Sequence, residues 1–183
     1  MIRSFIAVEM PSCDALLGLL DKLRSAQARL SVPRGEGMHV TLKFLGDIPE
    51  SGVAKIAEAL GEIASRSKRF EVEIIGTGAF PNARAPRVLW VGLSDNGRLS
   101  ELAAEIDTSM AKFGIPREKR PFKPHVTVAR IKSMYGVEDA ISVLREYESI
   151  SFGKFIVNDV RLKKSTLTPS GAIYEDLAVS SLS

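Results

Sequence analysis

The residues of this sequence best suited to chemistry are its two histidines, each of which begins a His-Val-Thr motif. His39 is followed by Val-Thr-Leu and His125 by Val-Thr-Val, so every histidine of the chain occurs in this setting. Valine and threonine favour β-strands, and each motif is short, apolar-rich and bounded by glycine or proline. Because side chains alternate along a strand, each histidine shares a face with the following threonine, Thr41 or Thr127. The sequence therefore predicts two strands that each present an imidazole and a hydroxyl group.

Two imidazoles and two hydroxyl groups suit acid–base chemistry at phosphorus. Histidine titrates near neutral pH, so one imidazole can accept a proton from a nucleophile while the other donates a proton to the leaving group. Threonine hydroxyls can donate hydrogen bonds to the oxygens of a tetrahedral anion. A single His-x-Thr on a strand is more often structural, but two copies that use every histidine predict one joint catalytic site. In-line displacement by this set requires neither a metal nor a cofactor.

The motifs and their flanks resemble the two-histidine phosphoesterase superfamily, and within it the RNA 2',3'-cyclic phosphodiesterases, historically called 2'-5' RNA ligases. Supporting segments run along the chain, from Arg3-Ser4-Phe5-Ile6-Ala7-Val8, through both motifs, to the stretch 165–174. The paired motif is specific, whereas each flanking segment is weak by itself. Met38 departs from the pattern, because many relatives carry another residue there, and this departure concerns substrate preference rather than the chemistry.

The resemblance implies hydrolysis of a terminal RNA 2',3'-cyclic phosphate to a 2'-phosphomonoester, with weak 2'-5' ligation as the reverse reaction. It implies that His39 is the proton donor and His125 the proton acceptor, with Thr41 and Thr127 on the non-bridging oxygens. The near symmetry of the two motifs gives no independent reason for that direction. The expected partner is RNA with a cyclic phosphate end, for which tRNA fragments are one source.

A basic loop runs directly into the second motif, and two of its residues are candidates for substrate binding. Arg120 and Lys123 lie in a proline-flanked stretch from residue 115 to 124. Lysine and arginine contribute sequence-independent affinity for nucleic-acid phosphates. The alternative is a solvated loop whose charges are partly paired with Glu118.

Three more candidate substrate-binding residues are Lys43, Arg130 and Tyr174. Regular alternation places Lys43 on the face of the first histidine and Phe44 on the opposite, apolar face. The same rule points Arg130 away from the second histidine, unless the strand is distorted there. Tyr174 could stack on a nucleobase through its aromatic ring.

The element order predicts an α+β fold built from two similar halves. Helix, loop, His-x-Thr strand, helix and two strands occur twice, and the histidines are 86 residues apart (125 minus 39). We therefore expect one bilobal domain over residues 1–183. Each of its two pseudo-symmetric lobes would have an antiparallel sheet backed by helices, with the active-site cleft between them. Within this order we expect a first helix from Ser12 to about residue 30, a strand over 152–162, a polar turn over 163–171 and a last strand over 172–179.

Composition bounds the remaining properties. The chain has 183 residues, a formal net charge of +3 and one cysteine, Cys13, so no intrachain disulfide can form. A single cysteine fits a reducing compartment. No apolar stretch approaches the length of a membrane span. We expect a cytoplasmic monomer that does not associate with membranes.

Three other readings stay open. A non-catalytic RNA-binding domain would use the basic loop but leaves the paired histidines unexplained. A metal site would need ligand clusters, and no His-x-x-x-His or Cys/His cluster occurs. The third reading keeps the same chemistry on a smaller molecule, such as a cyclic phosphate derived from ADP-ribose or a 2'-5' linked oligonucleotide.

Overall fold

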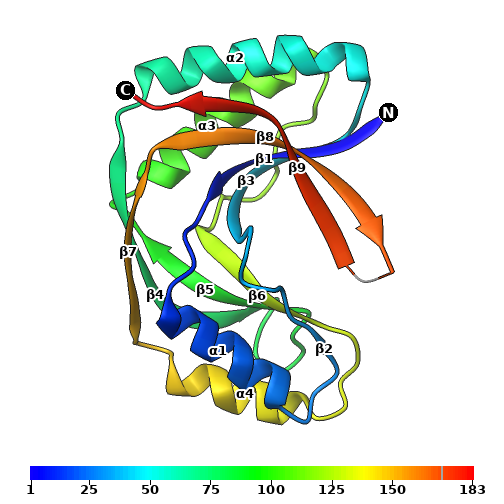
Figure 1. Cartoon of the computed structure of the whole chain (residues 1–183), viewed down its shortest axis with the longest axis vertical. Helices are drawn as coiled ribbons and strands as arrows, with labels where there is room; N and C mark the ends of the chain where they lie inside the picture. The colour runs from blue at the N-terminus through cyan, green and yellow to red at the C-terminus, as the bar shows by residue number, and fades with distance from the viewer. Residues whose placement is uncertain (170) are drawn as a thin grey trace.

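Two antiparallel sheets, one in each of two lobes, form the framework of the protein (Figure 1). The computed structural model describes residues 1–169 and 171–183. The sheet of lobe A has the strand order β3-β1-β8-β9, formed by His39–Ile48, Ile2–Glu9, Asp159–Thr168 and Gly171–Ser181. The sheet of lobe B has the order β2-β6-β5-β4-β7, formed by Leu30–Ser31, His125–Ile131, Val88–Ser94, Phe70–Phe80 and Ser151–Val157. The predicted α+β fold with two antiparallel sheets is confirmed.

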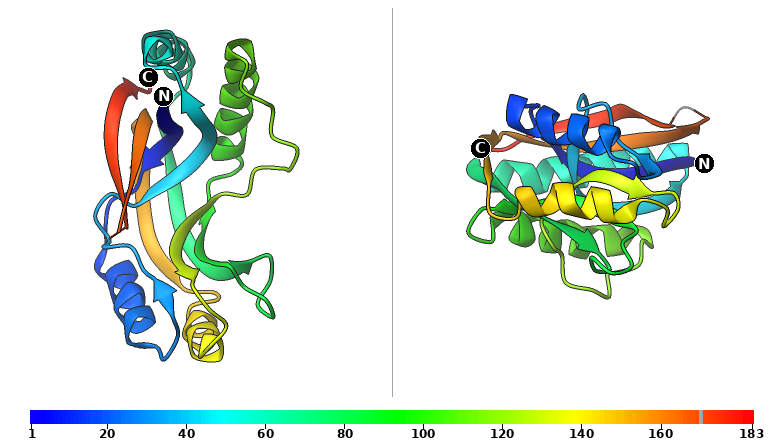
Figure 2. Two further views of the ribbon diagram at one scale, coloured as in Figure 1. Left: turned by 90° about the vertical axis from the view of Figure 1, so that its right-hand side faces the viewer. Right: turned by 90° about the horizontal axis from the view of Figure 1, so that it is seen from below.

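Two helices pack against each sheet, at opposite ends of the molecule (Figure 2). Helices α2 (Val53–Arg66) and α3 (Arg98–Met110) belong to lobe A, and α1 (Asp14–Ser25) and α4 (Val137–Glu146) to lobe B. Each helix buries an apolar stripe with the three- and four-residue spacing of one helical face. The buried stripe of α2, for example, consists of Ile56, Leu60, Ile63 and Ala64. Helix α1 is shorter than predicted, because the chain leaves it for the short strand β2.

The chain crosses between the lobes several times. The predicted repeat of helix, His-x-Thr strand, helix and two strands is present, as α1-β3-α2-β4-β5 and α3-β6-α4-β7-β8. Each repeat is divided between lobes, since α1 packs in lobe B while the motif strand of the same repeat, β3, belongs to lobe A. Each lobe is therefore assembled from both halves of the sequence.

The single strand predicted over 152–162 is wrong. The structure has two strands there, separated at Asn158, and they join different sheets. Phe152, Phe155 and Val157 are buried in lobe B, whereas Val160 and Leu162 are buried in lobe A. Both segments look alike in sequence because each buries alternate apolar side chains.

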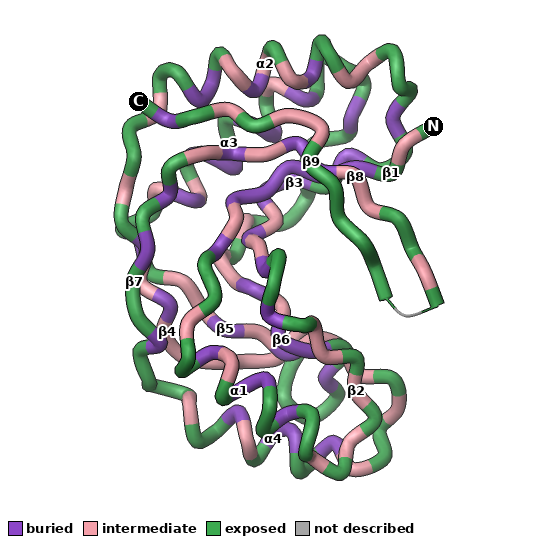
Figure 3. Tube along the Cα trace, viewed as in Figure 1, coloured by how far each residue is buried: buried purple, intermediate pink, exposed green. Residues whose placement is uncertain are grey.

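The polar turn predicted over 163–171 is also wrong for most of its length. Strand β8 continues to Thr168 and pairs with β9, whose first residue is Gly171, while the predicted turn residue Ser170 lies outside the described residues. Charged side chains replace apolar ones because they pair across the two strands, as Lys164 does with Glu175. The far end of this hairpin projects from lobe A and is largely exposed (Figure 3). Among the described residues, no helix combines the length and apolar character needed to cross a membrane.

Candidate active site

The two motif strands meet where the lobes come together. Strand β3 lies at the edge of the lobe A sheet, and it approaches β6 of lobe B (Figure 1). His39 is the first residue of β3 and His125 the first residue of β6. The fold therefore brings together the segments that carry both histidines, although they are 86 residues apart in sequence (125 minus 39).

Both imidazole rings are held by the same backbone contact. His39 Nδ1 lies 2.9 Å from the carbonyl oxygen of Gly37, and His125 Nδ1 lies 2.6 Å from that of Lys123. A carbonyl oxygen only accepts hydrogen bonds, so in each case Nδ1 carries the proton and donates it. Nε2 is then the nitrogen left for acid–base chemistry on each ring.

Aromatic side chains pack beside each imidazole. The His39 ring centroid is 4.9 Å from that of Phe5 and 4.8 Å from that of Tyr174, which meets it edge-on. The His125 ring centroid is 4.9 Å from that of Phe80 and 6.5 Å from that of Trp90. These contacts restrict the rotation of both rings and shield them from water.

Burial lowers the pKa of both histidines below the ordinary value of 6.5. For His39, the carbonyl of Gly37 partly offsets burial, and the charges of Lys163 and Glu9 act in opposite directions. For His125, a carbonyl again offsets burial, and the positive charge of Arg130 lowers the pKa further. Near neutral pH both rings are thus mainly neutral and able to exchange a proton with a substrate.

A β-bulge at the same position in each motif strand decides which later side chains face the histidines. The pairing of β3 with β1 shifts at Leu42, and the pairing of β6 with β5 shifts at Val128. Each extra residue reverses the alternation for the residues that follow. Phe44 is consequently exposed on the His39 face, 6.3 Å from the Phe5 ring, and its predicted apolar placement is wrong. Arg130 is exposed and faces the His125 side, to which regular alternation did not assign it.

The predicted placement of Lys43 on the His39 face is wrong for the same reason. Its side chain is 1% exposed and turned toward α3, where Nζ lies 2.7 Å from Asp107 Oδ1 and 3.3 Å from Glu118 Oε1. Nζ also donates to the carbonyl of Pro116 at 2.6 Å. Asp107 further accepts from Arg117 and from the Glu118 amide. Lys43 therefore anchors the start of the basic loop rather than facing the histidines.

The remaining predicted binding residues lie at different distances from the histidines. Lys123 is exposed, and its Nζ lies 5.9 Å from the centroid of the Phe80 ring that packs on His125. Tyr174 contacts His39 directly and is 42% exposed. Arg120 is exposed farther along the loop. Thr41 and Thr127 are both half-buried, each two residues beyond its histidine as predicted.

Several residues around the histidines were not predicted from the sequence. Phe80 belongs to β4, which extends through it to pair with β5 at Val88. Glu9 and Lys163 reach His39 from other strands, and no spacing in the sequence links them to it. Cross-strand neighbours of this kind become apparent only once the sheet order is known.

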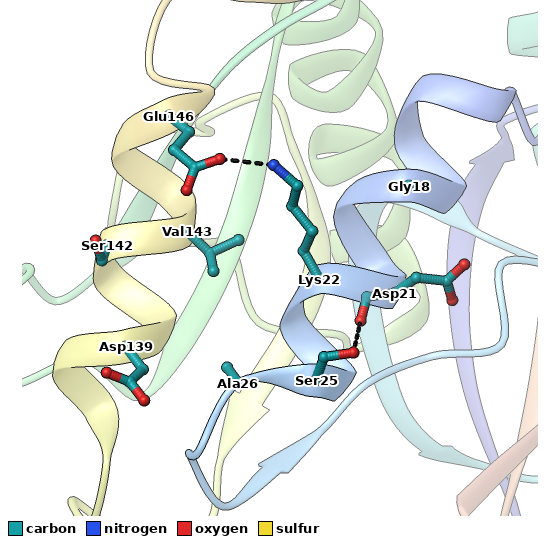
Figure 4. A pocket seen from close by; sticks show the side chains of 9 residues that line it. All are labelled: Gly18, Asp21, Lys22, Ser25, Ala26, Asp139, Ser142, Val143 and Glu146. Atoms are coloured by element: carbon teal, nitrogen blue, oxygen red, sulfur yellow. Dashed lines mark hydrogen bonds and ion pairs between the residues drawn. The ribbon is translucent and has the colours of Figure 1, made fainter.

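A groove of about 500 Å³ lies elsewhere, between α1 and α4 (Figure 4). Lys22 and Glu146 form an ion pair of 2.6 Å across it, with both side chains about half exposed. It contains no histidine or aromatic side chain; its lining is Gly18, Asp21, Lys22, Ser25, Ala26, Asp139, Ser142, Val143 and Glu146. Within the described part of the chain, no three His, Cys, Asp or Glu residues gather as potential metal ligands.

Comparison with known proteins agrees with this geometry. Residues 13–165 match the family model described as the 2'-5' RNA ligase superfamily. The chain belongs to this superfamily. A relative from Archaeoglobus fulgidus, named RNA 2',3'-cyclic phosphodiesterase, is 38% identical over 180 residues, which cover 97% of this chain and 99% of the relative.

Solved structures share the fold of this superfamily member. The crystal structure of TT0787 from Thermus thermophilus superposes with a TM-score of 0.82 at 29% identity, covering 98% of this chain and 97% of that protein. E. coli LigT complexed with 3'-AMP superposes with a TM-score of 0.73 at 20% identity, covering 100% of this chain and 98% of LigT. The second likeness supports the bilobal fold alone.

Substitution of Lys43 tests its structural placement. We expect Lys43→Met to lower the free energy of unfolding by about 3 kcal/mol, because Asp107 stays buried and loses one of its cationic partners. We expect kcat/KM for a mononucleoside 2',3'-cyclic phosphate, which is too short to extend over the basic loop that Lys43 anchors, to change by less than about twofold, since no catalytic contact is lost. Urea unfolding and initial rates measure the two quantities. Lys55→Met, at an exposed helix position, is the matched control. If Lys43→Met has normal stability but a large loss of activity, Lys43 contacts the substrate and its structural role is contradicted.

Proposed function

We propose that this chain, acting as one bilobal domain over residues 1–183, hydrolyses terminal 2',3'-cyclic phosphates of RNA to 2'-phosphomonoesters through His39 and His125. The observation that carries this proposal is the matched presentation of both histidines. Each begins a motif strand of a different lobe, and each donates its Nδ1 proton to a backbone carbonyl. Membership of the 2'-5' RNA ligase superfamily supplies the reaction class.

The proposed mechanism is a single in-line displacement with two proton transfers. Nε2 of neutral His125 accepts a proton from water as the water oxygen attacks phosphorus. The bond between phosphorus and the 3' oxygen breaks, and Nε2 of protonated His39 donates its proton to that oxygen. The products are a 2'-phosphomonoester and a 3' hydroxyl, and proton exchange with solvent restores both rings.

Hydrogen bonds and positive charge would stabilise the phosphorus centre as the displacement proceeds. We assign Thr41 and Thr127 to the non-bridging oxygens, because each shares a face with its histidine. Arg130 faces the His125 side, where its positive charge favours a bound phosphate. On the other lobe, the exposed edge of Tyr174 beside His39 would support a nucleobase, with Phe5 and Phe44 next to it.

The RNA 5' of the reacting end would pass over the basic loop of lobe B. Arg120 and Lys123 are exposed, and Lys123 lies over an aromatic ring that contacts His125. tRNA fragments are one source of such ends. We further propose that the protein is cytoplasmic, which the single cysteine, Cys13, supports. We also propose that it is a monomer and that it catalyses weak 2'-5' ligation as the reverse of the same reaction.

Replacement of each histidine tests the mechanism. We expect His39→Ala and His125→Ala each to lower kcat on a short RNA with a 2',3'-cyclic phosphate end by at least about 10²-fold, because general acid or base catalysis is lost. Wild-type turnover should yield a 2'-phosphate and persist with a chelator present. ³¹P NMR identifies the product.

The same assay separates the alternative functions. If the folded wild-type protein does not hydrolyse the RNA but does hydrolyse a small cyclic nucleotide, the small cyclic nucleotide would replace RNA as the proposed substrate. RNA binding without turnover of either molecule would contradict the phosphodiesterase assignment. Loss of turnover with the chelator would contradict the metal-independent mechanism.

Neutralisation of the basic loop tests the RNA path. We expect Arg120→Ala combined with Lys123→Ala to raise KM for a ten-nucleotide RNA by about tenfold at low salt. The dependence of KM on salt should also become weaker, because the variant makes fewer phosphate contacts and binding therefore releases fewer counterions. A mononucleoside 2',3'-cyclic phosphate is the control substrate, since it lacks the upstream phosphates. An equal loss on both substrates would show that the loop acts on the site itself and not on the RNA chain.

A further inference from the structure

The two histidines occupy equivalent positions in their sheets but have different charged neighbours. In lobe A, β3 is followed by β1 and β8, and in lobe B, β6 is followed by β5 and β4. Glu9 of β1 is the direct cross-strand partner of His39, whereas Gly92 of β5 is that of His125. A carboxylate therefore stands beside one histidine at a position where the other lobe has no side chain.

Glu9 is fixed in place by two cations of β8. Its Oε1 lies 2.6 Å from Lys163 Nζ, and its Oε2 lies 2.7 Å from Arg161 Nη1. Both cations also contact Asp176 of β9, and Arg161 contacts Asp159. The Lys163 side chain is only 4% exposed, so this network is shielded from solvent where it meets Glu9. A carboxylate held by two cations on both oxygens cannot turn away from its neighbours.

The two imidazoles face different sets of charged groups. From β1, β8 and β9, His39 is faced by Glu9, Lys163 and the phenol of Tyr174. The network around Glu9 holds three carboxylates and two cations, those of Glu9, Asp159, Asp176, Arg161 and Lys163. His125 is faced by Arg130 of its own strand, with Lys123 nearby, and by the uncharged rings of Phe80 and Trp90.

We propose that Glu9 is a positioning residue that offsets the positive charge of Lys163 beside His39 and so keeps His39 available as the proton donor. Its negative charge stabilises the imidazolium of His39 against burial and against the nearby ammonium of Lys163. Lys163 serves mainly to tie β1, β8 and β9 together, and without Glu9 it would face His39 unopposed. No carboxylate stands at the equivalent position beside His125, whose cross-strand partner is Gly92 and which is faced by the cation Arg130. The carboxylate beside His39 is thus a difference between the lobes that the symmetric motifs do not show.

The effects on the His39 pKa agree with this arrangement. Glu9 raises the pKa of His39, and Lys163 lowers it more strongly. Removal of Glu9 should therefore lower the pKa of His39, and removal of Lys163 should raise it. A general loss of packing would not shift this pKa in two opposite directions.

Histidine titration by ¹H NMR tests the inference directly, because the chain has two histidines whose Cε1 protons are assigned with His39→Ala and His125→Ala. We expect Glu9→Gln to lower the pKa of His39 by about half a unit or more, and Lys163→Met to raise it by a similar amount. The pKa of His125 should stay within about 0.2 units in both variants, because the network does not face it. Asp159→Asn is the matched control, since it removes a carboxylate of the same network that contacts Arg161 only.

The inference is contradicted if His39 does not respond, if His125 moves equally, or if Asp159→Asn has the effect of Glu9→Gln. If Glu9→Gln does not fold, Glu9→Gln combined with Lys163→Met decides, because the pKa of His39 should then be lower than in Lys163→Met alone. The catalytic consequence rests on the proposed function, whereas the titration requires no substrate. With turnover, the alkaline limb of the kcat/KM profile in Glu9→Gln should move to lower pH while the acidic limb stays. An unmoved limb in an active enzyme overturns the role of Glu9, and an inactive wild type overturns the proposed function alone.

Discussion

A single backbone irregularity, repeated in both motif strands, determines which side chains surround the histidines. Without the bulges at Leu42 and Val128, strict alternation would place Lys43 and Ala129 beside the imidazoles and turn Phe44 and Arg130 away. With the bulges, the first four residues of each motif lie on the faces that alternation predicts, and the residues that follow lie on the opposite faces. The bulges therefore let one short strand bury its later residues in the core and still present His, Thr and one further residue on the face of the histidine.

The two lobes share the same arrangement of strand, bulge and histidine, but the side chains at equivalent positions differ. Two residues after each bulge, lobe A presents the apolar ring of Phe44 and lobe B the cation Arg130. Opposite each histidine, lobe A has Glu9 and lobe B has Gly92. If the two imidazoles were equivalent, either of them could act as the proton donor and the other as the acceptor. The charged side chains differ between the lobes, with a carboxylate beside His39 and a cation on the side of His125.

The sequence was sufficient for the motifs, the repeat of elements and the fold class, because these depend on local periodicity and on residue type. It was insufficient wherever the outcome depends on cross-strand pairing. The burial of Lys43 follows from a register shift against β1, and Asp107, its partner, comes from a helix 64 residues later (107 minus 43). Lys163 was expected in a turn, because its partners Glu9 and Asp176 lie far from it in sequence or across a hairpin. The division of the segment into β7 and β8 was likewise not predictable, because the two strands join different sheets but bury the same kind of apolar side chain.

The proposed mechanism requires that one phosphate group lies between both histidines. The most direct measurement is a ¹H NMR titration with a nucleoside 2'-monophosphate, the product group, while the two histidine Cε1 signals are followed together. The account predicts that both signals shift along one binding curve with a stoichiometry of one ligand per chain. A response from one histidine only, or two curves with different affinities, would contradict a shared site.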